Sequence, residues 1–131
     1  MGDITRTKAN VRPLAGSIIR KGTAGGTIEA GEAVYLNGTS GWAVTDSDAA
    51  ATALARGIMV SPEDAASGDT IDICVFGPVE GYSAMTPGAL HYISPNTGEI
   101  ATTAGTKSMI IGWAETATIL FVSPSMAADP T

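Results

Sequence analysis

The chain reads Gly31-Glu32-Ala33-Val34-Tyr35-Leu36 and, 57 positions later, Gly88-Ala89-Leu90-His91-Tyr92-Ile93. Each copy is followed by five residues rich in turn formers that end on a glycine, and then by a second short apolar run. Repeated segments usually correspond to one supersecondary unit each, and strand–turn–strand is the pattern of a β-hairpin. The sequence therefore predicts two similar hairpins, whose shared positions are Gly31, Tyr35, Gly41, Gly88, Tyr92 and Gly98.

Further short apolar runs lie on both sides of these hairpins. A strand is expected over Thr70–Phe76, and its first part, Thr70–Ile73, alternates polar and apolar residues as a half-buried strand does. Thr118–Val122 is almost wholly apolar and is expected to be covered on both faces. Only Asp46–Leu54 offers a helix candidate, and it is short enough to be an ordered loop instead. We expect an all-β fold, a single compact antiparallel β-sandwich or barrel of about eight to ten short strands.

The predicted organisation has three parts. Residues 1–26 form a basic extended N-terminal arm with a glycine-rich link, residues 27–124 form the β domain, and residues 125–131 form a flexible tail. The two similar hairpin-containing halves of the domain span about residues 27–81 and 82–124. A chain of 131 residues is long enough to bury the core of one such domain.

Charge is unevenly placed along a chain whose net charge is −6. The first 21 residues carry five cations and one acid, and the remainder carries two cations and twelve acids. Dispersed cations without neighbouring aromatic residues are a poor footprint for nucleic acid, so no nucleic-acid partner is expected. The arm is expected to bind an acidic protein surface, of its own body or of a neighbour, or else to be a solvated, disordered N-terminus. The candidate binding residues are Arg6, Lys8, Arg12, Arg20 and Lys21.

The sequence offers little that could catalyse a reaction or hold a metal. His91 is the single histidine and lies in a predicted strand, where a structural role is expected, and the lone Cys74 lies in an apolar run and is expected to be buried. Acidic pairs such as Glu63-Asp64 are explained by the solvation of a loop, and no Cys or His spacing fits a metal site. We expect no enzyme activity, no catalytic or metal-binding residues and no cofactor. The N-terminus lacks the apolar segment of a signal peptide, and no apolar run is long enough to span a membrane, so no membrane partner is expected.

Two features keep alternative interpretations. Arg56 interrupts an apolar run just before Gly57. One interpretation is an ion pair with an acid of a neighbouring strand or subunit, and the other is a charge on an edge strand that prevents aggregation. The larger aromatic residues either pack in the core and between subunits or form a sugar-binding platform. These aromatic residues are Trp42, Trp113, Tyr35, Tyr82 and Tyr92.

Four short stretches follow one another with glycine, valine or tyrosine at characteristic positions. They are Ala30–Leu36, Gly41–Val44, Gly57–Val60 and Ala66–Gly81. In this order the chain resembles the capsid decoration (cement) proteins of tailed bacteriophages. The second half, from Thr86 to Pro124, is similar to members of this group as well, so the resemblance covers about residues 27–124.

The resemblance implies a structural protein of the virion, made in the host bacterial cytoplasm and located on the outer capsid surface. Such a protein is often a homotrimer that stabilises the capsid by joining adjacent major capsid subunits, so its expected partners are the major capsid protein and itself. The segment Asp3–Lys21 would match the extended part that helps these proteins grip the shell. An alternative is a tail-fibre or receptor-binding β module that binds host-surface glycans. A small hydrolase is the third possibility and would require two convergent acids.

Overall fold

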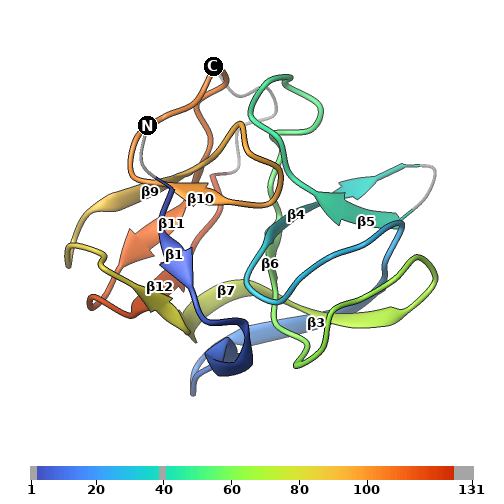
Figure 1. Cartoon of the computed structure of the whole chain (residues 1–131), viewed down its shortest axis with the longest axis horizontal. Helices are drawn as coiled ribbons and strands as arrows, with labels where there is room; N and C mark the ends of the chain where they lie inside the picture. The colour runs from blue at the N-terminus through green and yellow to red at the C-terminus, as the bar shows by residue number, and fades with distance from the viewer. Residues whose placement is uncertain (1–2, 39–40, 126–131) are drawn as a thin grey trace.

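The computed structural model describes residues 3–38 and 41–125 and confirms the predicted all-β fold. Its antiparallel sheet curls into a half-barrel (Figure 1). The strands of the first half are β1 (Thr5–Arg6), β2 (Arg12–Pro13), β3 (Ile18–Thr23), β4 (Ala33–Asn37), β5 (Gly41–Val44), β6 (Gly57–Met59) and β7 (Thr70–Glu80). Those of the second half are β8 (Tyr82–Ser83), β9 (Leu90–Ile93), β10 (Ile100–Ala101), β11 (Ile110–Ala114) and β12 (Ile119–Val122). A short 3-10 helix, η1 (Lys8–Asn10), follows β1.

The two repeated stretches form antiparallel hairpins, β4 with β5 and β9 with β10. The glycines of the repeat share an unusual backbone conformation. Gly31 and Gly88 have φ values of 90° and 86°, and Gly41 and Gly98 have values of 102° and 76°. Glycine adopts this left-handed region without strain because it has no Cβ. The repeat therefore copies backbone turns; Thr39 and Ser40 of the first turn lie outside the described residues.

Strand β7 is the longest strand, and both halves of the domain pair with it. Its first part pairs with β3 and β6, and its last part pairs with β12 and β2. In Figure 1 it runs from the group β9–β12 on the left to β3 on the right. The partners change at Gly77, where φ is 111° and a Cβ would lie 2.6 Å from the Cα of Ser17. A side chain at this position would be strained and would also push the neighbouring backbone away.

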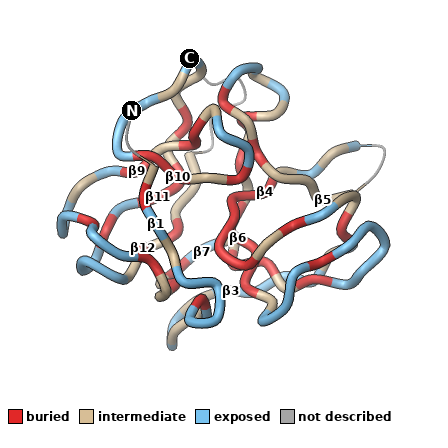
Figure 2. Tube along the Cα trace, in the orientation of Figure 1, coloured by how far each residue is buried: buried red, intermediate tan, exposed pale blue. Residues whose placement is uncertain are grey.

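The sheet curls far enough for strands distant in the sequence to meet. A bridge between Ala24 and Trp42 brings the end of β3 to β5, so β3, β7, β6, β4 and β5 surround the first part of the core. At the other end, Asp3 forms an antiparallel bridge with Ala101 of β10. The buried positions line the inside of the curl, as Figure 2 shows. The largest fully buried apolar side chains are Ile28, Ile58, Met59, Ile71, Ile73, Ile93, Ile100, Met109, Ile111 and Leu120.

The N-terminal segment differs from the sequence-based expectation, whereas the helix candidate adopts one of its two expected forms. Residues 3–26, predicted as an arm, are extended but lie along the domain, where they supply β1, β2 and β3 and place Ile4 and Val11 in the core. The helix candidate is an ordered loop, in which the Asp46 carboxylate accepts the backbone N–H of Asp48 at 2.9 Å. Of the predicted tail, residues 126–131 lie outside the described residues. Within the described ranges, no helix is long and apolar enough to cross a membrane.

Candidate interaction surface

A continuous row of apolar side chains crosses the outer face of the sheet. Residues directly opposed in an antiparallel pair lie on the same face. The strand register places Leu90 beside Trp113, and Trp113 beside Phe121. Ile18 of β3 lies opposite Phe76 of β7 in the same way. We call this row, formed by Leu90, Trp113, Phe121, Phe76 and Ile18, the apolar ridge.

The aromatic side chains of the apolar ridge hold one another in place. The Phe121 ring stacks on Trp113 with centroids 5.1 Å apart and meets Phe76 edge to face, also at 5.1 Å. Contacts of this kind favour fixed ring orientations. The ridge is nevertheless open to solvent, since Trp113 is 38% exposed, Phe76 44%, Leu90 46% and Ile18 54%. A contiguous exposed apolar patch marks a surface that contacts another molecule.

Strand β12 is buried on its inner face and only partly covered on its outer face. The sequence predicted that its apolar run is covered on both faces. The inner side chains, Leu120 and Val122, are fully buried, but Phe121 on the outer face is covered only in part, by the other two rings of the ridge. Within this chain the prediction therefore holds for the inner face of β12 and not for its outer face.

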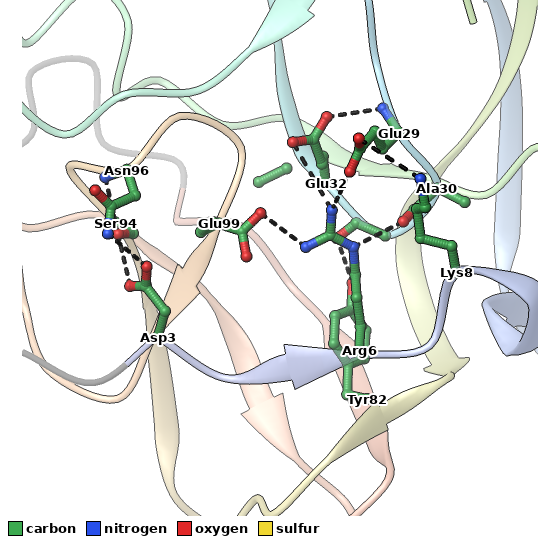
Figure 3. Close-up of polar contacts among 12 residues, drawn as sticks. Asp3, Arg6, Lys8, Glu29, Ala30, Glu32, Tyr82, Ser94, Asn96 and Glu99 are labelled. Carbon is green, nitrogen blue, oxygen red and sulfur yellow. Dashed lines mark hydrogen bonds and ion pairs between the residues drawn. The ribbon is translucent and has the colours of Figure 1, made fainter. Parts of the chain in front are cut away.

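Arg6, whose side chain is only 9% exposed, ties the two halves of the domain together (Figure 3). Its guanidinium donates hydrogen bonds to the Ala30 carbonyl at 2.9 Å, to Glu99 at 2.8 Å and to Glu29 at 3.1 Å. The Glu32 carboxylate lies 3.8 Å away. Glu29 and Ala30 precede the first hairpin, whereas Glu99 belongs to the second. We call these five residues the Arg6 network.

Burial and neighbouring charges shift the pKa values of Arg6 and Glu32 in opposite directions. Burial lowers the pKa of Arg6, but the hydrogen bond and charge of Glu99, together with the charge of Glu32, outweigh it and raise the pKa overall. Burial also raises the pKa of Glu32, against the opposing effects of the Glu29 N–H and the Arg6 charge. Arg6 therefore keeps its charge, and Glu32 depends on Arg6 for compensation.

Asp3 fixes the beginning of the described chain to the turn of the second hairpin. Its carboxylate accepts hydrogen bonds from the Ser94 hydroxyl and the Asn96 amide, both at 2.7 Å (Figure 3). Together with the Arg6 network, this contact places the N-terminal segment across both hairpins.

The remaining predicted site cations lie at the surface. Lys8 is 3.2 Å from Asp64, Arg12 is 2.6 Å from Glu80, and Lys21 is 2.7 Å from Asp72. For Arg20, no acid of the described residues lies within ion-pair distance. Lys8, Arg12 and Lys21 thus pair with acids of the same chain.

The side chains of His91 and Cys74, which carry groups that could react, are both buried. His91 lies in β9 with its Nδ1 3.0 Å from the Ala89 carbonyl, and burial lowers its pKa. Burial raises the pKa of the Cys74 thiol to about 11, which keeps it protonated at neutral pH. Across residues 3–38 and 41–125, no cluster of three or more His, Cys, Asp or Glu side chains is arranged to hold a metal ion.

The five larger aromatic residues have different environments. Trp113 belongs to the apolar ridge, whereas Tyr82 is buried and donates its hydroxyl hydrogen bond to the Gly31 carbonyl at 2.7 Å. Trp42 lines a cleft beside the apolar ridge. Tyr35 and Tyr92 are half-buried.

Sequence reasoning missed the partners of Arg6 and the continuity of the ridge. Glu29 and Glu32 flank Gly31 of the repeat, which is the one sequence signal that could have drawn attention to them. The ridge depends on strand register, which no single run of residues reveals. A scan against protein-family models matches no family, and a search of curated proteins finds no matching sequence.

Proposed function

We propose that the protein is a structural virion protein that binds the outer surface of an icosahedral phage capsid and cements adjacent major capsid subunits. The observation that best supports this role is the apolar ridge, a preformed and exposed row of side chains on a rigid sheet. A cement protein acts through contact area, and a stable contact buries on the order of 1,000 Å² or more. A protein that binds only the assembled lattice stabilises that lattice by mass action.

The proposed assembly uses two surfaces. The ridge packs against neighbouring copies in a homotrimer, which buries the apolar side chains that the monomer leaves exposed. The exposed cations of the N-terminal segment face the shell. Lys8, Arg12 and Lys21 form ion pairs at solvent-exposed positions, where such pairs contribute little to folding. They can therefore exchange their intramolecular acids for acids of the capsid.

Electron cryo-microscopy of phage particles purified from cells that produce this protein tests its location. We expect its density on the outside of the shell, at positions where three capsid subunits or capsomers meet. Density on the tail would instead support the receptor-binding alternative, and particles without the protein would overturn a virion role.

Light scattering of the purified protein tests the ridge. We expect a trimer for the wild type and a monomer for the variant with both Ile18→Ser and Leu90→Ser. The matched control is Leu36→Ser, because Leu36 is 58% exposed but lies off the ridge. A double variant that remains trimeric, or a control that dissociates as fully, would contradict the assignment of the ridge as the contact between copies.

A further inference from the structure

A cleft of about 710 Å³ opens beside the apolar ridge, between the end of β4, β5, β3 and β7. Its apolar lining includes Leu36, Trp42 and Phe76, and the last of these also belongs to the ridge. Its charged lining consists of three cations, Arg20, Lys21 and Arg56. These are three of the seven lysine and arginine residues in a chain of net charge −6, so the cleft is a local exception to the charge of the molecule.

Arg56 is the unusual member of this lining. Its Nη1 atom is buried, yet no acceptor among the described residues forms a hydrogen bond with it. A buried donor without an acceptor destabilises the folded state, and a guanidinium is suited to bind a carboxylate through two parallel hydrogen bonds. Arg6 shows the contrast within the same molecule, because three acceptors lie within 3.1 Å of its guanidinium.

The rest of the cleft defines what kind of group would fit beside that carboxylate. Leu36 is 58% exposed and Phe76 44%, so the apolar floor is accessible. Lys21 is neutralised by Asp72 at 2.7 Å, but Arg20 has no acid within ion-pair distance in the described part of the chain. Among the described residues, the guanidinium groups of Arg20 and Arg56 thus have no acidic partner, and both line the cleft around its apolar surface.

We propose that this cleft binds a segment of a partner protein in which a carboxylate side chain stands next to an apolar side chain. The carboxylate meets Arg56 and Arg20, and the apolar group lies against Trp42, Leu36 and Phe76. A protein segment is the occupant because the cleft is open at the surface and combines guanidinium groups without acidic partners with an exposed apolar floor, which only a chain bearing both kinds of side chain would match. The binding chemistry does not depend on the identity of the capsid, and it goes beyond the cementing role.

An array of hexapeptides that pair Asp or Glu with Leu, Phe or Trp, at spacings of one and two residues, provides the probe. The strongest binder is then measured in solution by fluorescence anisotropy, beside the same peptide with Asn or Gln in place of the acid. We expect the amide peptide and the variant Arg56→Gln each to weaken binding about tenfold or more, because each removes a charged hydrogen-bond partner. The control Lys107→Gln, which removes a cation that does not line the cleft, should leave the affinity unchanged.

Three results would overturn the proposal. One is equal affinity for the acid and amide peptides, a second is unchanged affinity in Arg56→Gln, and the third is no binding of any peptide at about 1 mM. Circular dichroism checks that Arg56→Gln is folded. If it is not, Arg20→Gln takes its place, and the acid-to-amide comparison decides the outcome with the wild-type protein alone. These peptide measurements need no capsid, so their failure is distinct from failure of the proposed function.

Discussion

Replacing Arg6 with methionine removes the donors of the Arg6 network and keeps an apolar stem of similar length. The side chain of Arg6 is only 9% exposed, so water cannot replace the lost bonds freely. Arg12→Met is the matched control, because Arg12 forms an even shorter contact with a glutamate, at 2.6 Å, but is 68% exposed. The two variants remove the same kind of ion pair from a buried and an exposed site.

The expected cost follows from the partners that Arg6 leaves behind. The half-buried Glu99 loses a charge-assisted hydrogen bond of about 1.5 kcal/mol, and the Ala30 carbonyl loses its donor at about 1 kcal/mol. Glu29 is 42% exposed and adds less than about 0.5 kcal/mol. We therefore expect Arg6→Met to lower the free energy of unfolding by about 3 kcal/mol, and Arg12→Met to lower it by less than about 0.5 kcal/mol.

Urea denaturation followed by circular dichroism measures both values, and thermal melting should show a decrease in Tm of about 10 °C for Arg6→Met. A second replacement, Glu99→Gln in the Arg6→Met background, should cost less than Glu99→Gln alone, because its partner is already gone. If the two methionine variants differ by less than about 1 kcal/mol, burial does not govern the strength of these pairs and the reasoning fails.

Three further outcomes are expected. Gly77→Ala should lower the free energy of unfolding by about 1 kcal/mol or more beyond the loss caused by Gly68→Ala. Both glycines have a positive φ, but only at Gly77 would the added Cβ meet neighbouring backbone. Equal losses for the two variants in denaturation curves would contradict this. Cys74, whose pKa is about 11, should react with Ellman's reagent only after denaturation, and rapid reaction of the folded protein would show that it is accessible. Burial lowers the pKa of His91, so the stability that it contributes is present above its unfolded value of 6.5 and is lost as the pH falls below it. His91→Asn should remove at most about 1.4 kcal/mol per pH unit from that decline, and unchanged slopes in urea titrations between about pH 7 and pH 5 would refute the assignment.

The hairpins could be predicted because their signals are local. Turn glycines such as Gly31 and Gly98 and the short runs between them determine strand and turn without reference to the rest of the chain. Strand β7 shows the limit of this reasoning. Gly77-Pro78 has the composition of a strand end, and the sequence predicted a strand over Thr70–Phe76 only. The strand continues because Gly77 lets Ser17 approach, a contact between residues 60 positions apart.

The candidate surface was only partly predictable, for a related reason. The apolar character of β12 and the position of Trp113 in a strand are visible in the sequence, but their alignment with Phe76 and Ile18 depends on the register of four strand pairs. The uneven charge likewise predicted an acidic surface for the N-terminal cations. It did not show that Arg6 would be enclosed by acids from both hairpins, since Glu29 and Glu99 are 70 positions apart.

Because both halves of the domain hydrogen-bond to β7, the duplicated unit is not a separable module. Cutting the chain between Glu80 and Tyr82 would leave the second half without the strand against which β12 pairs, and the first half with an exposed edge over the last residues of β7. Phe76 of the apolar ridge belongs to β7, and Phe121 belongs to β12, which pairs with β7. A force applied to the ridge would therefore act on the hydrogen bonds that join β7 to β12 and to β3. Strand β7 therefore couples the two halves mechanically. Under a pulling force, we expect both halves to unfold together in a single step.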